Sequence, residues 1–308
     1  MDMVMSILRR SPRSLKAFTK EIRALNLPAF SETELSVAFL RSLPNEDAQL
    51  DIPCEQIRRA YRRHVATLEE YGALESVTIA PDLTAYQMPT TKLPAPEQLI
   101  CIFDPFCYLS HLSALAWHGL SERLPKTVFV SRPSRSQWQA LAGTKLDDRL
   151  GDWSRINSVC KLSRYQFRDY TRIGNHAIHF WTSSRLDREY SSAFKNIKDQ
   201  HIRVATIGRC FLDMVRSPDL CGGIHHVMDI YSEHSATYLD LILKEIDSFG
   251  NKIEKARAGY LLESSISTDQ PVLSQWLKTV SRGGSRKLDP SADYSERFSE
   301  RWGLSLNV

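Results

Sequence analysis

Apolar positions recur at helical spacing in three segments near the amino end of the chain. The first expected helix runs from Ser14 to about Leu25. The second runs from Ser31 to about Leu43, and Ser31 with Glu34 forms a capping-box pattern at its start. The third begins after Pro53 and ends near Tyr71, where Gly72 follows. The spacing therefore predicts a helical region before any strand.

The third of these segments, CEQIRRAYRRHVATLEEYG, has two different faces when it is projected at 100° per residue. Its apolar side holds Ile57, Tyr61 and Leu68, with His64 and Val65 at the margin. The opposite side holds four arginines: Arg58, Arg59, Arg62 and Arg63. A helix with this pattern buries one face and presents a basic face to solvent.

Two short β-type runs flank a Pro-Asp turn in the following stretch, ALESVTIAPDLTAYQMP. Three helices and then a ribbon is the order of a winged helix-turn-helix, in which the third helix enters the major groove of DNA. This reading assigns DNA contacts to the four arginines and to Thr78 and Tyr86 in the ribbon between Val77 and Tyr86. A solvated basic face without DNA binding is the alternative, and the pattern alone does not exclude it.

The segment MPTTKLPAPEQ marks the expected domain boundary, because three prolines in eight residues fit neither a helix interior nor a central strand. We expect an α+β protein with a winged-helix domain at 1–91, a linker at 92–98 and a larger mixed α/β domain at 99–308. In the larger domain the pattern predicts a helix from Ser110 to Gly119 and then a strand in TVFVS. It also predicts a strand–turn–strand unit in YTRIGNHAIHFWTSS and a strand in HIRVAT. A helix capped by Thr206 follows, then a tight turn at CGGI and helices around 226–234, 238–249 and 252–264.

Composition changes this picture little. The chain has 308 residues and a net charge of +4, which permits nucleic-acid binding without arguing for it. Six cysteines without a CxxC pair make a structural zinc site unlikely and favour mostly reduced, packed thiols. The sequence has neither an apolar run long enough to span a membrane nor the charge-then-apolar order of a secretory signal, so we expect a cytoplasmic protein without a membrane partner.

Candidate chemistry points away from an enzyme and from a bound cofactor or metal. His111 and His118 lie seven residues apart, further than the i, i+4 spacing of a helical zinc pair, and His225 and His226 are adjacent and point apart. Asp293 and Glu296 stand in a polar stretch instead of a strand that could hold magnesium, and no G-x-S-x-G elbow is present. We expect Asp213 to pair with Arg209 and leave open the role of the basic loop at Arg282–Lys287. A nuclease that uses the carboxyl-terminal domain, with acids and a lysine such as Asp240, Glu254 and Lys255, stays an alternative.

Three blocks after the boundary share a pattern with a known family. They are YLSHLSALAWHGLSERLPKTVFVS at 108–131, TIGRCFLDMVRSPDLCGGI at 206–224 and KARAGYLLE at 255–263. In this order, and with the ending KLDP to RWGLSLNV, they resemble AbiEi-type antitoxins, the DNA-binding members of type IV toxin–antitoxin systems. The chain departs from the family pattern at Gly208 and Cys210, where we would expect Glu and Thr.

The resemblance implies a transcriptional autorepressor. Such a protein binds inverted repeats in its own promoter and counters a co-encoded nucleotidyltransferase-type toxin through its carboxyl-terminal domain. A winged-helix regulator of a phage-defence or mobile-element locus without a toxin partner is the nearest alternative.

Overall fold

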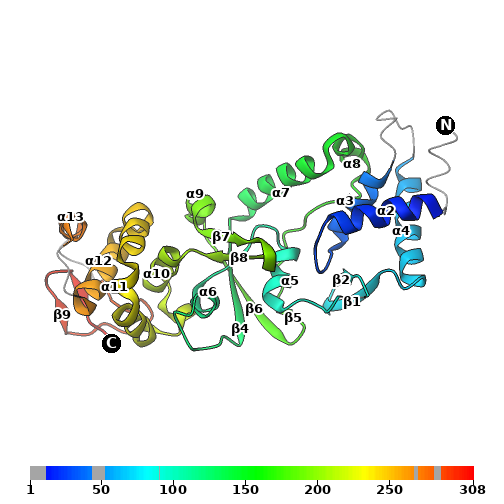
Figure 1. Cartoon of the computed structure of the whole chain (residues 1–308). Coiled ribbons are helices and arrows are strands. Elements are labelled where there is room, and N and C mark those ends of the chain that lie inside the picture. The colour runs from blue at the N-terminus through cyan, green and yellow to red at the C-terminus, as the bar shows by residue number, and fades with distance from the viewer. Residues whose placement is uncertain (1–11, 44–52, 90, 267–269, 281–285) are drawn as a thin grey trace. The chain divides into compact units, whose positions relative to one another are not determined.

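The computed structural model describes residues 12–43, 53–89, 91–266, 270–280 and 286–308. The chain is a mixed α/β protein whose amino-terminal region is helical (Figure 1). It forms two compact units. The amino-terminal unit contains the residues up to 106 together with 133–176, and the carboxyl-terminal unit contains 107–132 and 177–308.

Three helices open the amino-terminal unit: α2 (Pro12–Ala24), α3 (Glu32–Ser42) and α4 (Cys54–Glu70). Their bounds confirm the three predicted helices. The hydroxyl of Ser31 accepts a hydrogen bond from the backbone N–H of Glu34 at 3.2 Å, as the capping pattern predicts. The carboxylate of Glu34 is instead ion-paired to Arg149, so of the two hydrogen bonds of a capping box the one from Ser31 to the Glu34 backbone forms.

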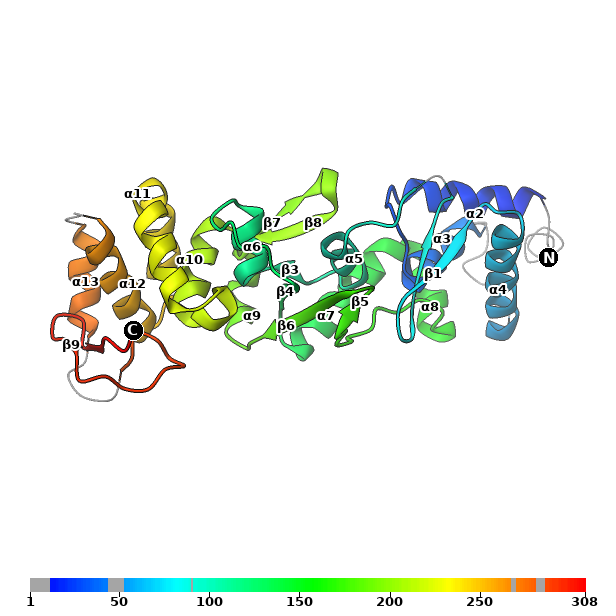
Figure 2. The same ribbon diagram turned by 90° about the horizontal axis from the view of Figure 1, so that it is seen from below.

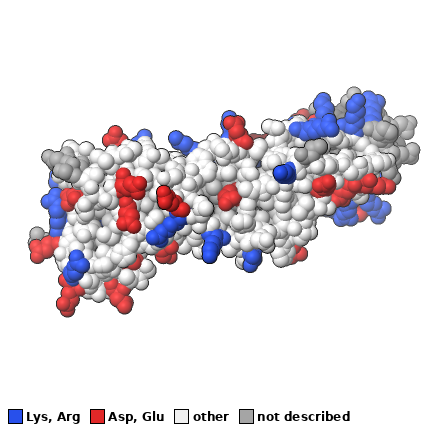
Figure 3. All heavy atoms as spheres, turned by 60° about the horizontal axis from the view of Figure 1, so that its bottom comes forward, with Lys and Arg blue, Asp and Glu red and all other residues white. Residues whose placement is uncertain are grey.

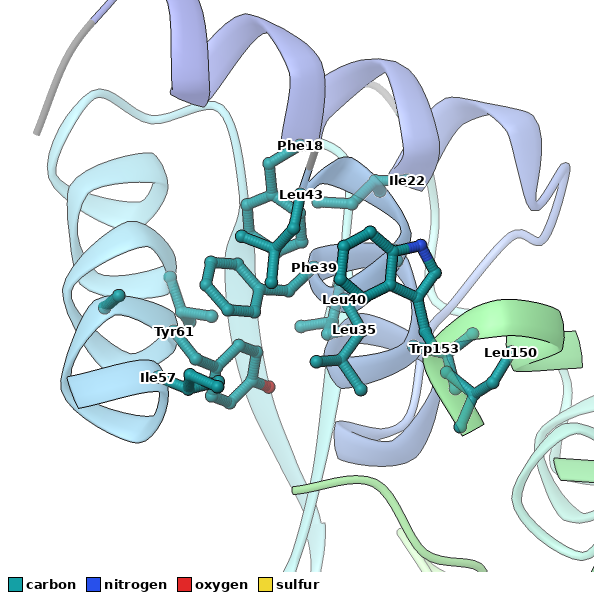
Figure 4. Packing of buried hydrophobic residues seen from close by; sticks show 14 of the residues in the cluster. Phe18, Ile22, Leu35, Phe39, Leu40, Leu43, Ile57, Tyr61, Leu150 and Trp153 are labelled. Carbon is teal, nitrogen blue, oxygen red and sulfur yellow. The ribbon is translucent and has the colours of Figure 1, made fainter. Parts of the chain in front are cut away.

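The core of this unit lies between the three helices (Figure 4). The ring of Phe39 on α3 packs edge-on against Phe18 of α2 and Tyr61 of α4, with ring centroids 5.7 and 5.5 Å apart. Edge-to-face geometry is the favoured arrangement for aromatic pairs and adds to the gain from burial. The apolar faces that the sequence predicts for the three helices therefore pack together in one core.

A two-stranded antiparallel ribbon follows, formed by β1 (Glu75–Ala80) and β2 (Leu83–Gln87). Thr78 pairs with Thr84, the ladder is irregular between Thr78 and Ala80, and Asp82 takes a positive φ of 58° in the turn. Backbone hydrogen bonds between Phe30 and Tyr86 fix β2 to the chain just before α3. The predicted strand–turn–strand is thus confirmed.

The segment 133–176 belongs to the amino-terminal unit, although it comes after the expected domain boundary. It contains α7 (Arg135–Leu150), a 3₁₀ turn η1 (Gly151–Trp153), α8 (Ser154–Cys160) and β5 (Arg172–Ile173). Apolar side chains of this segment join the three-helix core: Leu150, Trp153, Ile156 and Cys160. The expected linker at 92–98 also differs, because α5 (Pro96–Phe103) begins inside it. The prolines do mark the end of the helix–ribbon region, but they give no information on which later segment packs into the core of the amino-terminal unit.

The carboxyl-terminal unit contains a mixed sheet with the strand order β6-β4-β3-β8-β7. These strands are β3 (Tyr108–Leu109), β4 (Thr127–Arg132), β6 (His176–Thr182), β7 (Phe194–Ile197) and β8 (Ile202–Ala205). β4 runs parallel to β6 and antiparallel to β3, while β8 runs parallel to β3 and antiparallel to β7. The strands predicted in TVFVS and HIRVAT are confirmed, as is the order of strand, turn and strand through β5 and β6.

Helices make up the rest of this unit. Their bounds, in chain order, are α6 (His111–Trp117), α9 (Leu186–Glu189), η2 (Tyr190–Ser192), η3 (Lys198–Gln200), α10 (Ile207–Arg216), η4 (Pro218–Cys221), α11 (Ile224–Phe249), α12 (Lys252–Ser265) and α13 (Pro271–Thr279). α10, α11 and α12 lie side by side in both ribbon views (Figures 1 and 2). Two helices were predicted where α11 is one element with non-helical backbone at Tyr238. A short strand pair, β9 (Phe298–Ser299) and β10 (Leu304–Ser305), follows near the carboxyl end.

The resemblance blocks contact one another within this unit. Gly259 lies against Trp302, and a Cβ atom at position 259 would stand 2.1 Å from the indole ring. The guanidinium of Arg257 donates hydrogen bonds to the carbonyl oxygens of Val215 and Lys287, at 3.0 and 2.9 Å. The blocks KARAGYLLE, TIGRCFLDMVRSPDLCGGI and the carboxyl ending therefore share one packing arrangement.

Candidate nucleic-acid interface

The helix α4 separates its residues as its amphipathic pattern predicts. Ile57, Tyr61 and Leu68 are buried, and so are Val65 and His64 at the margin. The imidazole of His64 contacts the carbonyl oxygen of Ala60 at 2.7 Å and the hydroxyl of Ser14 at 3.0 Å, and burial lowers the pKa of this histidine. The inner face of α4 is therefore a neutral surface that fixes the helix on the core.

The four predicted arginines of α4 differ in what they are free to contact. Arg59, Arg62 and Arg63 are exposed. Arg59 lies 3.4 Å from Glu55 in an exposed ion pair, while Arg62 and Arg63 form no ion pair with another described residue. Arg58 is only partly exposed, and its guanidinium donates to the carbonyl oxygen of Cys160 at 2.7 Å. Three of the four arginines thus form an outward basic face.

The ribbon presents one of its two predicted contact residues outward. The side chain of Thr78 is exposed. Tyr86 is half-buried and hydrogen-bonds to Glu32 at the start of α3; burial, with the nearby Glu32 carboxylate, raises the pKa of Tyr86 to about 12. The phenol of Tyr86 therefore serves the contact between ribbon and α3, which the alternation of residues along a strand could not reveal.

The segment 133–176 touches both elements of the candidate interface. The guanidinium of Arg168 donates to the carbonyl oxygen of Asp82 in the ribbon turn at 2.8 Å, and the N–H of Gly174 donates to Ile79 at 2.7 Å. A disulfide joins Cys54, the first residue of α4, to Cys160, the last residue of α8. Sequence reasoning missed this bond, because cysteines 106 positions apart carry no spacing signal for pairing. Four of the six cysteines remain free and buried, in line with the expected packed thiols.

Charge is unevenly spread over the amino-terminal unit. On the face drawn in Figure 3, Lys and Arg side chains gather in two groups over the region of α2 and α4, with a row of Asp and Glu between them. Such local clustering has more effect on an approaching polyanion than the net charge of +4 does. The basic loop expected at Arg282–Lys287 lies largely outside the described residues. Of its described members, Lys287 donates from its ammonium group to the carbonyl oxygen of Ala292 at 2.7 Å.

The stretch that holds His111 and His118 is buried at its start and partly exposed at its end. Ser110 is fully buried, and its hydroxyl contacts Nδ1 of His111 at 2.9 Å and the hydroxyl of Ser131 at 2.7 Å. Burial lowers the pKa of His111 to about 3, so the ring is neutral at ordinary pH. His118 ends α6 as expected, but its Nε2 meets the carbonyl oxygen of Ala205 on β8 instead of a carbonyl of its own helix. These contacts hold β3, α6 and β8 together.

A second buried polar cluster lies around α10. Arg209 is ion-paired to Glu189 at 2.5 Å and to Glu245 at 2.9 Å, and Arg216 is paired to Glu189 and Glu254. The predicted ion pair of Arg209 with Asp213 is wrong, because the guanidinium is taken by carboxylates from α9 and α11. Burial raises the pKa of Asp213 to about 6, while the charge of Arg209 acts in the opposite direction.

Within the described ranges, no three His, Cys, Asp or Glu side chains form a group that could hold a metal ion. The acids weighed for a nuclease lie on helices: Asp240 on α11 and Glu254 on α12. The Glu254 carboxylate accepts from the N–H of Asn251 at 2.8 Å and is ion-paired to Arg216, and Lys255 is bound to Asp247. In the same ranges no helix is both long enough and apolar enough to cross a membrane.

Comparisons with known proteins found a likeness among the solved structures but none among family models or curated sequences. A solved structure, described as the crystal structure of the RV2827C protein from Mycobacterium tuberculosis, is similar with 11% sequence identity and a TM-score of 0.48. The likeness covers 96% of this chain and 92% of that chain, and it establishes neither a family nor a function.

Proposed function

We propose that the amino-terminal unit is a winged helix-turn-helix that binds double-stranded DNA, with α4 as the recognition helix and the β1–β2 ribbon as the wing. The observation that carries the proposal is the division of α4: its apolar side lies in the core, and Arg59, Arg62 and Arg63 face outward on the helix that precedes the ribbon. Guanidinium groups bind phosphates as forks and read guanine edges with two hydrogen bonds, so this face suits a major groove.

We assign the remaining contacts on the same grounds. Thr78 is exposed on the ribbon and can reach a phosphate beside the groove, whereas Tyr86 and Arg58 have structural partners. The proposal therefore places the DNA contacts on Arg59, Arg62, Arg63 and Thr78. Arg58 is left out, because its guanidinium donates to the carbonyl oxygen of Cys160.

The biological role that we propose is that of an antitoxin and transcriptional autorepressor in the cytoplasm. It rests on the three blocks that resemble AbiEi-type antitoxins. Contacts of Arg257 and Gly259 join the blocks 206–224 and 255–263 and the carboxyl ending, which supports treating these parts as one functional unit. The partner would be a co-encoded nucleotidyltransferase-type toxin. In this role the chain acts by binding and without chemistry of its own.

A gel-shift assay on the DNA upstream of the protein's own gene tests the DNA-binding function. Replacing Arg59, Arg62 and Arg63 by Ala should weaken binding by at least tenfold at matched salt. The matched control replaces three exposed basic residues of the carboxyl-terminal unit by Ala: Arg188, Lys195 and Lys244. This control has the same net charge and should bind as the wild type does. Equal affinities of the two triple variants would contradict the assignment of α4.

Co-expression with the product of the neighbouring gene tests the antitoxin role separately. If that gene encodes a nucleotidyltransferase-like toxin, wild-type protein and the arginine variant should both restore growth, because neutralisation is assigned to the other unit. Only the wild type should repress a promoter fusion. Repression without any protection from the toxin would favour the regulator without a toxin partner, and magnesium-dependent cleavage of DNA by the pure protein would favour the nuclease.

A further inference from the structure

The first turn of α4 is bonded covalently to a distant part of the chain. Cys54 and Cys160 form a disulfide, with their Cα atoms 5.0 Å apart and a separation of 106 positions in the sequence. One turn further along α4, the guanidinium of Arg58 donates to the carbonyl oxygen of the same Cys160 at 2.7 Å. The start of the proposed recognition helix is therefore held against the end of α8 by one covalent bond and one hydrogen bond.

This bond stands where α4 lacks a side-chain cap. The residue before the helix is Pro53, whose side chain accepts no hydrogen bond from the first turn. Several other helices have a capping side chain: Ser31 for α3, Ser134 for α7, Thr206 for α10 and Asn251 for α12. The first N–H groups of a helix have no partner within the helix, and an uncapped end frays more easily. The disulfide therefore adds a covalent restraint to a first turn that is otherwise held by its backbone hydrogen bonds to Pro53 and by the buried side chain of Ile57.

We propose that Cys54 and Cys160 form a thiol–disulfide switch that controls the order of the first turn of α4 and, through it, the affinity for DNA. The inference rests on the proposed DNA-binding function of α4. The disulfide form is the tight-binding form, because fraying that begins in the first turn loosens the helix toward Arg59, the first of the proposed DNA contacts along α4. After reduction the first turn frays, and binding must restore its order at a cost in affinity.

Reduction by a dithiol protein or a small thiol proceeds by exchange. A reductant thiolate attacks one sulfur to form a mixed disulfide, and the other cysteine leaves as a thiolate that takes up a proton. A second reductant thiol then displaces the second cysteine. Two electrons pass to the protein, two cysteine thiols form, and the reductant is left as a disulfide. Oxidation by a small disulfide reverses these steps.

Exposure makes this pair the reactive one. Cys54 is partly exposed and Cys160 is buried, so attack falls on the sulfur of Cys54 and Cys160 is the leaving thiolate. The four free cysteines are all buried, and burial raises the pKa of Cys210 and Cys221 well above its usual range. Thiols of that kind are inert toward exchange. In a reducing compartment, where lasting disulfides are rare, a reversible pair has the character of a sensor.

Fluorescence anisotropy on the upstream DNA, with the full chain in oxidised glutathione or in dithiothreitol, tests the switch. We expect the oxidised wild type to bind about fivefold more tightly than the reduced wild type, the size of effect that loss of a helix cap produces. The Cys54→Ser, Cys160→Ser double variant should bind as the reduced wild type does, in both buffers. Equal affinity of the two wild-type forms, or a redox response that persists in the double variant, would overturn the proposal.

A measurement without DNA separates this proposal from the DNA-binding function. Hydrogen exchange of the amides at 55–59 should be faster in the reduced than in the oxidised wild type, and alkylation should label Cys54 only after reduction. Equal exchange in both forms overturns the switch even where DNA is bound. Loss of DNA binding in every form, with the exchange difference intact, overturns instead the proposed function of α4 and with it the regulatory consequence.

Discussion

The carboxyl group of Asp213 illustrates what burial does to a single charge in this molecule. The residue is 3% exposed on α10, and burial raises its pKa to about 6, above the value near 3.9 of an unfolded chain. The folded state therefore binds this proton more tightly than the unfolded state does. Stability that this group contributes is complete below about pH 4 and is lost as the pH rises through about 6.

Asp213→Asn should remove this pH dependence. Relative to the wild type, the variant should gain about 2 to 3 kcal/mol in free energy of unfolding between pH 4 and pH 7, as chemical denaturation at both pH values would measure. Asp240→Asn, on the exposed side of α11, is the matched control and should show no such change. A difference between variant and wild type that is independent of pH would contradict the raised pKa of Asp213.

Among the elements of the amino-terminal unit, the segment 133–176 is bonded to both α3 and α4, by an ion pair and by a disulfide. Arg149 on α7 is ion-paired to the buried carboxylate of Glu34 on α3 and donates to the hydroxyl of Tyr165 at 2.8 Å. Thr33 donates to the carbonyl oxygen of Arg164 at 2.7 Å, next to that pair in the sequence. These contacts, together with the Cys54–Cys160 disulfide, explain why an apparently separate segment packs on α3 and α4.

Arg149→Ala should destabilise the amino-terminal unit by about 3 kcal/mol, because it leaves the Glu34 carboxylate buried without its counter-charge. The matched control is Arg41→Ala. Arg41 is ion-paired to Glu21 at 3.1 Å with nearly half of its side chain exposed, and its loss should cost below about 1 kcal/mol. Thermal unfolding of the two variants measures the difference. Similar losses of stability in both would show that the buried Arg149–Glu34 pair does not stabilise the unit more than an exposed pair does.

The helices and strands were largely predictable from the sequence, but the contacts that each makes with other segments of the chain were not. Ser31 and Thr206 were found as helix caps, and the arginine face of α4 was found from its period, because both signals are local. The pairing of Cys54 with Cys160 and the direction of Tyr86 depend on segments that meet only in the fold. For the same reason the ion pair expected within α10 is replaced by pairs to other helices.

The whole molecule is built from two units that each use two separate stretches of chain. The expected division at 92–98 would cut the first core, since Leu150, Trp153 and Ile156 complete it from beyond that boundary. Loop closure of this kind costs little extra entropy as the intervening chain lengthens, so a core can recruit a distant segment. Domain boundaries read from proline content alone therefore miss such recruitment.

A fragment of residues 1–106 should consequently fold poorly by itself. The same fragment joined through a flexible Gly/Ser linker to 133–176 should unfold cooperatively, because it regains the four apolar side chains and the disulfide of that segment. Calorimetry and binding of a hydrophobic dye to the two fragments would show this. Identical melting transitions would mean that 133–176 is dispensable for the first core.

The proposed function requires the outward face of α4 to bind DNA phosphates and bases. The salt dependence of the dissociation constant on the upstream DNA measures this most directly, since each neutralised phosphate contributes about 0.9 to the slope of log affinity against log salt. The Arg59, Arg62 and Arg63 triple alanine variant should bind more weakly and with a slope smaller by about 3 than that of the wild type. The same slope in both proteins would contradict the claim.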